Sequence, residues 1–162
     1  MARPEPRLAL LLEILDQAFD RRAWHGTTLR GSIRGLLTDE VLWRPGPRRH
    51  GIWEIVLHVA YWKYAVRRSL TGAERGAFPR PGSNWPRLPK HPTESAWEAD
   101  VALLMEQHEL LRETVIAFPP ARLDRRPHGG TWTFREQIHG VAAHDVHHAG
   151  QIQLVKRLRG RG

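Results

Sequence analysis

Apolar residues recur three and four positions apart in four segments of this chain, and this spacing constrains its fold more than any other feature. Three or four residues make about one helical turn, so each segment predicts an α-helix with one buried face. The apolar stripes cover residues 8–19, 52–66, 97–118 and 134–155. No segment alternates apolar and polar residues for long enough to predict a strand. We therefore predict an all-α fold, most simply a four-helix bundle made by a single domain over residues 1–162.

Capping residues mark the ends of the last two helices. Thr93 is a good N-cap for the third helix, and the prolines at 119–120 are expected to end it, because proline cannot continue a helix. Thr133 and Glu136 have the spacing of a capping box at the start of the fourth helix. Gly160 is expected to end that helix.

A long proline-rich connection separates the second and third predicted helices. The second helix is expected to begin near Gly51 and to end before Gly72. The following stretch, about residues 71–92, holds five prolines, which keep it non-helical. A connection of this length is usually a crossover or a lid, and in a bundle it can join helices that are not antiparallel neighbours. A shorter helical stripe over residues 29–37 is predicted after a break near Gly26.

The chain contains no cysteine. This excludes disulfides, thiolate metal ligands and a cysteine nucleophile, so any thiol chemistry must use the thiol of a bound small molecule. Arg3 and Arg7 precede a leucine run, as in a secretion signal, but Glu13 and Asp16 interrupt that run and no small-residue cleavage site follows. No stretch is long and apolar enough to span a membrane. We expect a soluble, cytoplasmic protein with no membrane partner.

The charge of the chain is strongly basic, at a formal +8 with an isoelectric point near 11.1. Such a balance can indicate nucleic-acid binding. The arginine pairs, however, are scattered at positions 21–22, 48–49, 67–68 and 125–126, and only the tail at 156–161 is a cluster. Because scattered charges do not form one contact surface, we expect no specific nucleic-acid partner.

Helical geometry separates the ten histidines of the chain. Each residue turns by about 100° around the helix axis, which puts His148 inside the buried arc of the fourth helix and His144 about 40° to one side of it. Four residues apart, the two side chains lie one above the other and can hold one metal ion. Alternatively, the two histidines are exposed to solvent or hydrogen-bonded within the core, without a metal. His139 and His147 point toward the flanks or solvent and are not predicted ligands.

His58 is the candidate third ligand, at the edge of the apolar face of the second helix. It completes a three-histidine site if the second and fourth helices face each other. Three neutral imidazoles suit Zn²⁺, Ni²⁺, Fe²⁺, Mn²⁺ or Co²⁺. Three protein ligands leave coordination positions open, as in catalytic sites, where a bound water or a thiolate can react.

Several other polar and aromatic side chains are candidates for the surroundings of such a site. His108 lies within the buried stripe of the third helix, either as a hydrogen-bonded core histidine or as a pocket residue near the metal. Gln151 and Asp145 can orient ligands or substrate, although Asp145 lies about 100° around the helix from His144. The candidate pocket walls, which are equally candidates for core aromatics, are Trp24, His25, Trp62 and the loop around Trp85.

Two sequence segments resemble motifs of the DinB/YfiT-like superfamily. Residues 144–152 read HDVHHAGQI and are similar to its last helix, which carries two histidines four residues apart and then Gly-Gln-Ile. Residues 52–62 read IWEIVLHVAYW and resemble its second-helix motif, which carries the first histidine ligand. The likeness covers nearly the whole chain, including Trp24-His25-Gly26 and Asn84-Trp85-Pro86.

This resemblance implies a DinB-like four-helix bundle of up-up-down-down topology, with a long crossover between helices 2 and 3. It implies a divalent metal, often nickel or zinc, held by three histidines that map onto His58, His144 and His148. Many members of the superfamily are dimers. Characterised members include transferases and isomerases that use a low-molecular-weight thiol, such as bacillithiol or mycothiol, and metal-dependent hydrolases.

Two classes of function remain open from the sequence. The first is a metal-dependent enzyme, a thiol S-transferase or a hydrolase acting on a small molecule. The second is a non-catalytic module that binds a metal or ligand in a stress response. No glutamate follows a ligand as in H-E-x-x-H, which argues against a zincin-type peptidase and leaves the second class open.

Overall fold

The computed structural model describes residues 5–74, 76 and 78–160, and every structural statement below concerns these residues. They form α-helices and one 3₁₀ turn, with no strand, which confirms the predicted all-α class. The helices are α1 (Pro6–Phe19), α2 (Leu29–Ile33), α3 (Thr38–Leu42), α4 (Ile52–Thr71), α5 (Glu94–Ile116) and α6 (Phe134–Arg159), with η1 at Pro120–Arg122. Within this described part, no helix combines the length and the apolar character needed to cross a membrane.

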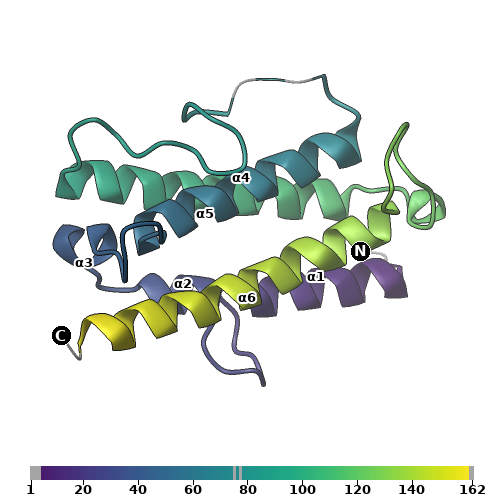
Figure 1. Cartoon of the computed structure of the whole chain (residues 1–162). Helices are drawn as coiled ribbons and strands as arrows, with labels where there is room; N and C mark the ends of the chain where they lie inside the picture. The colour runs from purple at the N-terminus through teal and green to yellow at the C-terminus, as the bar shows by residue number, and fades with distance from the viewer. Residues whose placement is uncertain (1–4, 75, 77, 161–162) are drawn as a thin grey trace.

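Helices α4 and α5 are parallel neighbours. Helices α1 and α6 are also parallel neighbours, and they run in the direction opposite to that of α4 and α5 (Figure 1). The first turn of α4 contacts the first two turns of α5, where the indole Nε1 of Trp53 donates a hydrogen bond of 2.7 Å to Asp100 Oδ2. The start of α1 and the start of α6 are joined through Asp124, whose carboxylate accepts from Arg7 and Arg135, each at 3.0 Å.

The expected up-up-down-down order is therefore wrong. Helix α1 runs one way, α4 and α5 run the other way, and α6 returns in the direction of α1. The reason lies in residues 20–51, which fold into α2 and α3 at the end of the molecule where α1 finishes. Helix α2 packs against α6 and α3 against α4, so α4 starts at that end and has to run back along α1.

The predicted helix ends are confirmed. The hydroxyl of Thr93 accepts from the backbone of Ala96, and Thr133 and Glu136 form the reciprocal capping box of α6. Helix α4 ends at Gly72, a C-cap in the left-handed conformation at φ 68°, which glycine adopts without steric cost. The stripe predicted over residues 29–37 is helical only at Leu29–Ile33, because the chain turns at Gly35, whose φ is 71°, before α3 begins at Thr38.

Two apolar clusters make the core, and the polar candidates lie where they meet. Along α4, residues 52–60 belong to the first cluster and 66–70 to the second. Along α6, the order is reversed, with 134–142 in the second cluster and 149–155 in the first. Antiparallel packing of α4 and α6 thus places the middle of each helix at the junction of the clusters. The buried polar side chains at or near this junction are His58, Lys63, Gln107, His108, Asp145 and His148.

Candidate metal centre

Three histidine side chains from α4 and α6 converge at the junction of the two core clusters. His58 comes from α4, and His144 and His148 come from consecutive turns of α6. The Nε2 atom of His144 lies 3.0 Å from Nε2 of His58 and 3.0 Å from Nε2 of His148. One ring nitrogen from each residue lies within 4.8 Å of the others, which is the spacing that one metal ion requires.

The outer hydrogen bonds of the rings fix which nitrogen faces the centre. Nδ1 of His58 donates to the backbone carbonyl of Asn84 at 2.6 Å, and Nδ1 of His148 donates to Oε1 of Gln151 at 2.7 Å. Both rings therefore carry a lone pair on Nε2. His144 can offer only one proton to these two lone pairs, so the cluster holds more acceptors than donors. A bound cation satisfies all three nitrogens, and the donor set fits a divalent metal.

Burial keeps these imidazoles neutral, the form that binds metal. It is the main cause that lowers the pKa of His144 to about 3 and that of His148 to about 4, with the neighbouring imidazoles adding to both shifts. Burial also lowers the pKa of His58, against the hydrogen bond to Asn84, which raises it. At neutral pH, protons therefore do not compete with a cation for the ring nitrogens of these three histidines.

Aromatic stacking from the segment between α4 and α5 holds the His58 ring. The Trp85 ring lies parallel to that of His58 at 3.9 Å and parallel to that of His50 at 3.7 Å, so the three rings form one stack. Asn84 has a φ of 63° and accepts a hydrogen bond of 2.8 Å from Nε1 of Trp62 through its side chain. Sequence reasoning singled out Trp62 and Trp85 but missed the carbonyl of Asn84 and the ring of His50.

A fully buried ion pair lies beside the histidines. Lys63 Nζ donates to Asp145 Oδ2 at 2.5 Å, and both side chains are 0 % exposed. Burial raises the pKa of Asp145, and the ammonium of Lys63 opposes that shift. Asp145 thus faces Lys63 rather than the converging nitrogens. Sequence reasoning missed Lys63, although a lysine four residues after Val59 in an apolar stripe is a signal for a buried charge.

His108 lies deep in the protein and outside the three-histidine group. Its ring stacks on Phe19 with the ring centroids 3.7 Å apart, and it is 2 % exposed. The hydrogen bond expected of a core histidine is absent at Nδ1, which has no partner among the described residues. Burial, with help from the charges of Lys63 and Arg112, lowers the pKa of His108 to about 2. His108 is therefore a neutral aromatic in the core.

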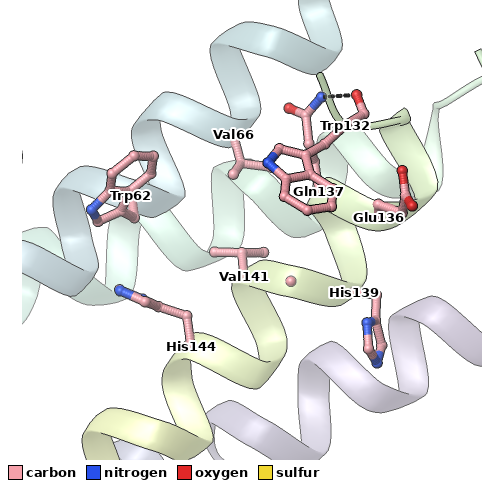
Figure 2. Close-up of a pocket in the computed structure, with 9 residues that line it drawn as sticks. Trp62, Val66, Trp132, Glu136, Gln137, His139, Val141 and His144 are labelled. Carbon is pink, nitrogen blue, oxygen red and sulfur yellow. Dashed lines mark hydrogen bonds between the residues drawn. The ribbon is translucent and has the colours of Figure 1, made fainter. Parts of the chain in front are cut away.

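A cavity of about 400 Å³ opens beside His144. Figure 2 shows Trp62 and Val66 of α4 on one side of it and His144 and Val141 of α6 on the other, with Trp132 at its far end. This hollow, which we call the apolar cavity, is also lined by Glu136, Gln137, His139 and Gly140.

A second cavity, of about 750 Å³, reaches the same centre from the side of His148. Trp85, His147 and Gln151 line it close to that ligand, and Arg48 and Arg49 line it as well. We call it the basic cavity. The three histidines thus lie between two cavities of different character.

The remaining two aromatic candidates are not brought to this centre. The side chain of Trp24 is fully exposed, at 101 %, and His25 is exposed as well. Both follow the end of α1, and neither lines the apolar or the basic cavity.

Comparison with known proteins gives one result. A sequence model of the DinB superfamily matches residues 21–152, which is most of the chain and includes all three converging histidines. No curated protein and no solved structure matches the chain.

Proposed function

We propose that this chain, which belongs to the DinB superfamily, binds one divalent metal ion through His58, His144 and His148 and uses it to act on a small molecule. The observation that carries the proposal is the convergence of three Nε2 atoms, two of which must bear lone pairs. Buried polar groups are normally paired, and one proton from His144 cannot satisfy both lone pairs, whereas a bound cation pairs all three nitrogens.

The residues around the three histidines hold the rings in the orientation that metal binding needs. Asn84 and Gln151 hold the tautomers of His58 and His148 through their oxygens, which also fixes the ring orientations. Three protein ligands leave positions on a metal for water or substrate. When bound, the metal would act as a Lewis acid that lowers the pKa of a water or a thiol. Trp62 lines the approach to the site from the apolar cavity, and Trp85 lines the approach from the basic cavity.

Of the two enzymatic reactions, transfer of a low-molecular-weight thiol is better supported than hydrolysis. Hydrolysis benefits from a general base beside the metal-bound water. Asp145 is occupied by Lys63, and Glu136, the one carboxylate lining either cavity in the described residues, is bound to Thr133. A thiol needs only the metal to become a thiolate at neutral pH. The absence of cysteine requires that this thiol come from a small molecule.

The same lack of a free carboxylate also supports a second candidate, a module that binds metal or ligand without turnover. Under either function, we propose that the four long helices form the DinB-type four-helix bundle with a crossover between α4 and α5. We propose further that the metal is Ni²⁺ or Zn²⁺ and that the protein acts in the cytoplasm as a homodimer. Sedimentation equilibrium measures the oligomeric state directly.

Metal analysis of the purified protein tests the central claim. We expect about one Ni²⁺ or Zn²⁺ per chain, lost in His144→Ala and in His148→Ala. His139→Ala is the matched control, because His139 lies on the same helix but outside the converging group, and it should retain the metal. Equal metal content in all four proteins would contradict the proposal.

Turnover distinguishes the two candidates. The nickel- or zinc-loaded protein is incubated with bacillithiol or mycothiol and an electrophilic acceptor, and loss of free thiol is followed. Metal-dependent consumption that disappears in His144→Ala identifies an enzyme. Thermal stabilisation by the thiol without consumption identifies a binding module, because a ligand that binds only the folded state raises its melting temperature.

A further inference from the structure

The basic cavity carries positive charge that no acidic group of the described residues neutralises. Arg48 and Arg49 line it, and within the described residues neither forms an ion pair. No carboxylate of residues 5–74, 76 or 78–160 lines the cavity. The nearest acidic side chain in sequence, Glu54, pairs with Arg44 at 2.9 Å and with His50 at 3.3 Å. It also accepts from the backbone of Gly51 at 2.8 Å.

This charge lies on a segment that is tied to the metal centre. His50 follows the two arginines and stacks on Trp85, which stacks on the ligand His58. The backbone N–H of Arg49 donates to the carbonyl of Gly46 at 3.1 Å, which closes a turn. The two arginines therefore lie on a turn that is connected to the ligand His58 through the ring stack of His50 and Trp85.

The cavity also has an apolar side and an end at the metal. Ile55 and three residues of α6, Leu154, Val155 and Leu158, supply the apolar side. The ligand His148 and its partner Gln151 form the inner end. A molecule placed here can reach the metal with one end while its other end meets the arginines.

The opposite cavity has no such charge. In the part of the chain that the structure describes, Glu136 is the one lining residue with a formal charge at neutral pH, counting histidine as neutral, and no arginine or lysine lines this cavity. An anion is therefore favoured on the His148 side of the centre and not on the His144 side. Arginine matches the planar carboxylate and the tetrahedral oxyanion equally, since its fork of donors can bind both.

We propose that the basic cavity binds the anionic group of the small molecule that the metal centre acts on. The inference rests on the proposed function, and it specifies the ligand as a compound that carries a carboxylate or a tetrahedral oxyanion in addition to the atom at the metal. Arg48 and Arg49 bind that group, and the apolar side contacts the stem between them.

Three small thiols test this with the zinc-loaded protein. Mercaptosuccinate carries carboxylates, 2-mercaptoethanesulfonate carries a tetrahedral oxyanion, and 1-thioglycerol is neutral. Isothermal titration calorimetry should show at least one anionic thiol binding about tenfold tighter than the neutral one, which corresponds to about 1.4 kcal/mol. The preferred anion identifies the group. Equal affinities for all three, with zinc bound, would overturn the inference and leave the proposed function intact.

Matched variants separate the cavity from the general charge of the protein. Arg48→Gln/Arg49→Gln should abolish the preference and leave 1-thioglycerol affinity and zinc content unchanged. Arg21→Gln/Arg22→Gln removes the same charge from another exposed arginine pair, which lines neither cavity, and should keep the preference. An equal loss in both double variants would overturn the inference, since it would show only long-range attraction.

Failure of the metal site itself is detected separately. Zinc content is measured on every sample, and succinate is titrated into the zinc-free His144→Ala protein after its helical content is checked by circular dichroism. Succinate binding that Arg48→Gln/Arg49→Gln removes in this background supports the anion site even where no metal binds. Absence of succinate binding in a folded His144→Ala protein that carries both arginines, together with equal thiol affinities, refutes it.

Discussion

Removing one partner of the Lys63–Asp145 pair should cost far more free energy of unfolding than removing both. The two charges are 2.5 Å apart, so their attraction is about 6–7 kcal/mol at an effective dielectric constant of about 20. Both side chains are fully buried, and taking two ions out of water costs several kcal/mol each. Oδ1 of Asp145 has no hydrogen-bond partner among the described residues, so the pair is incompletely compensated and its net contribution is near zero.

A double-mutant cycle measures this balance. Lys63→Met leaves a buried carboxylate without its cation, and Asp145→Val leaves a buried ammonium, so each should lower the free energy of unfolding by about 3–5 kcal/mol. The double variant places two apolar side chains in a comparable volume and should lie within about 1 kcal/mol of the parent. Urea unfolding is followed by circular dichroism at pH 7.5 with a chelator present, so that metal binding does not contribute.

An exposed ion pair supplies the control. Arg30 and Asp20 are 3.3 Å apart with side chains 50 % and 30 % exposed, and Arg30→Met should cost less than about 1 kcal/mol. The reasoning fails if Lys63→Met costs no more than Arg30→Met. It also fails if the loss in the double variant equals the sum of the two single losses, because the two sites would then be independent.

Three further predictions concern the surroundings of the ligands. Trp85→Ala should lower zinc affinity about 10–100-fold, since the ring orients His58; competition with a chromophoric chelator measures this, and an effect as large in the exposed Trp24→Ala would contradict it. Asn84→Gly should keep zinc affinity, because it is the backbone carbonyl at position 84 that binds His58. Asn84→Val should lose about 1–3 kcal/mol of stability, because valine is strained in the left-handed conformation of this residue. Equal chelator titrations and urea midpoints for the two variants would argue against this. Below about pH 6.5, His108 stays neutral in the folded protein but takes up a proton in the unfolded chain, so its contribution to the free energy of unfolding is full above that pH and declines by about 1.4 kcal/mol per pH unit below it. Between pH 6.5 and 4.5, metal-free His108→Phe should therefore lose less stability than the metal-free parent. Urea unfolding measures this, and an equal loss in the two proteins would refute the assignment.

The sequence predicted the local features of this fold, because local chemistry determines them. Thr93 and Thr133 mark helix starts through their own side chains, and the spacing of His144 and His148 places them on one face whatever packs against it. The direction of α4 relative to α1 was missed, because it depends on where residues 20–51 fold and on no residue within either helix.

The parts of the site that sequence reasoning missed are contacts between distant segments. The acceptor for His58 is a backbone carbonyl 26 residues away, and any residue type at position 84 presents one. The Lys63–Asp145 pair joins residues 82 positions apart. Each of these two residues lies at a stripe position of its own helix, so two opposite charges in facing stripes were the available signal.

Because α4 and α5 are parallel, the connection between them runs back along their length. This connection can be exchanged for another segment. The segment lies outside the helix pairs, yet it presents Asn84 and Trp85 to the ligand His58. Its length and composition can change while the helix contacts persist, provided that the carbonyl at 84, the ring at 85, the Arg80–Asp100 pair and the core contacts of Phe78 and Leu88 are kept. Loop grafting between α4 and α5 is therefore the route by which a new binding specificity can be selected in this protein without rebuilding its metal centre.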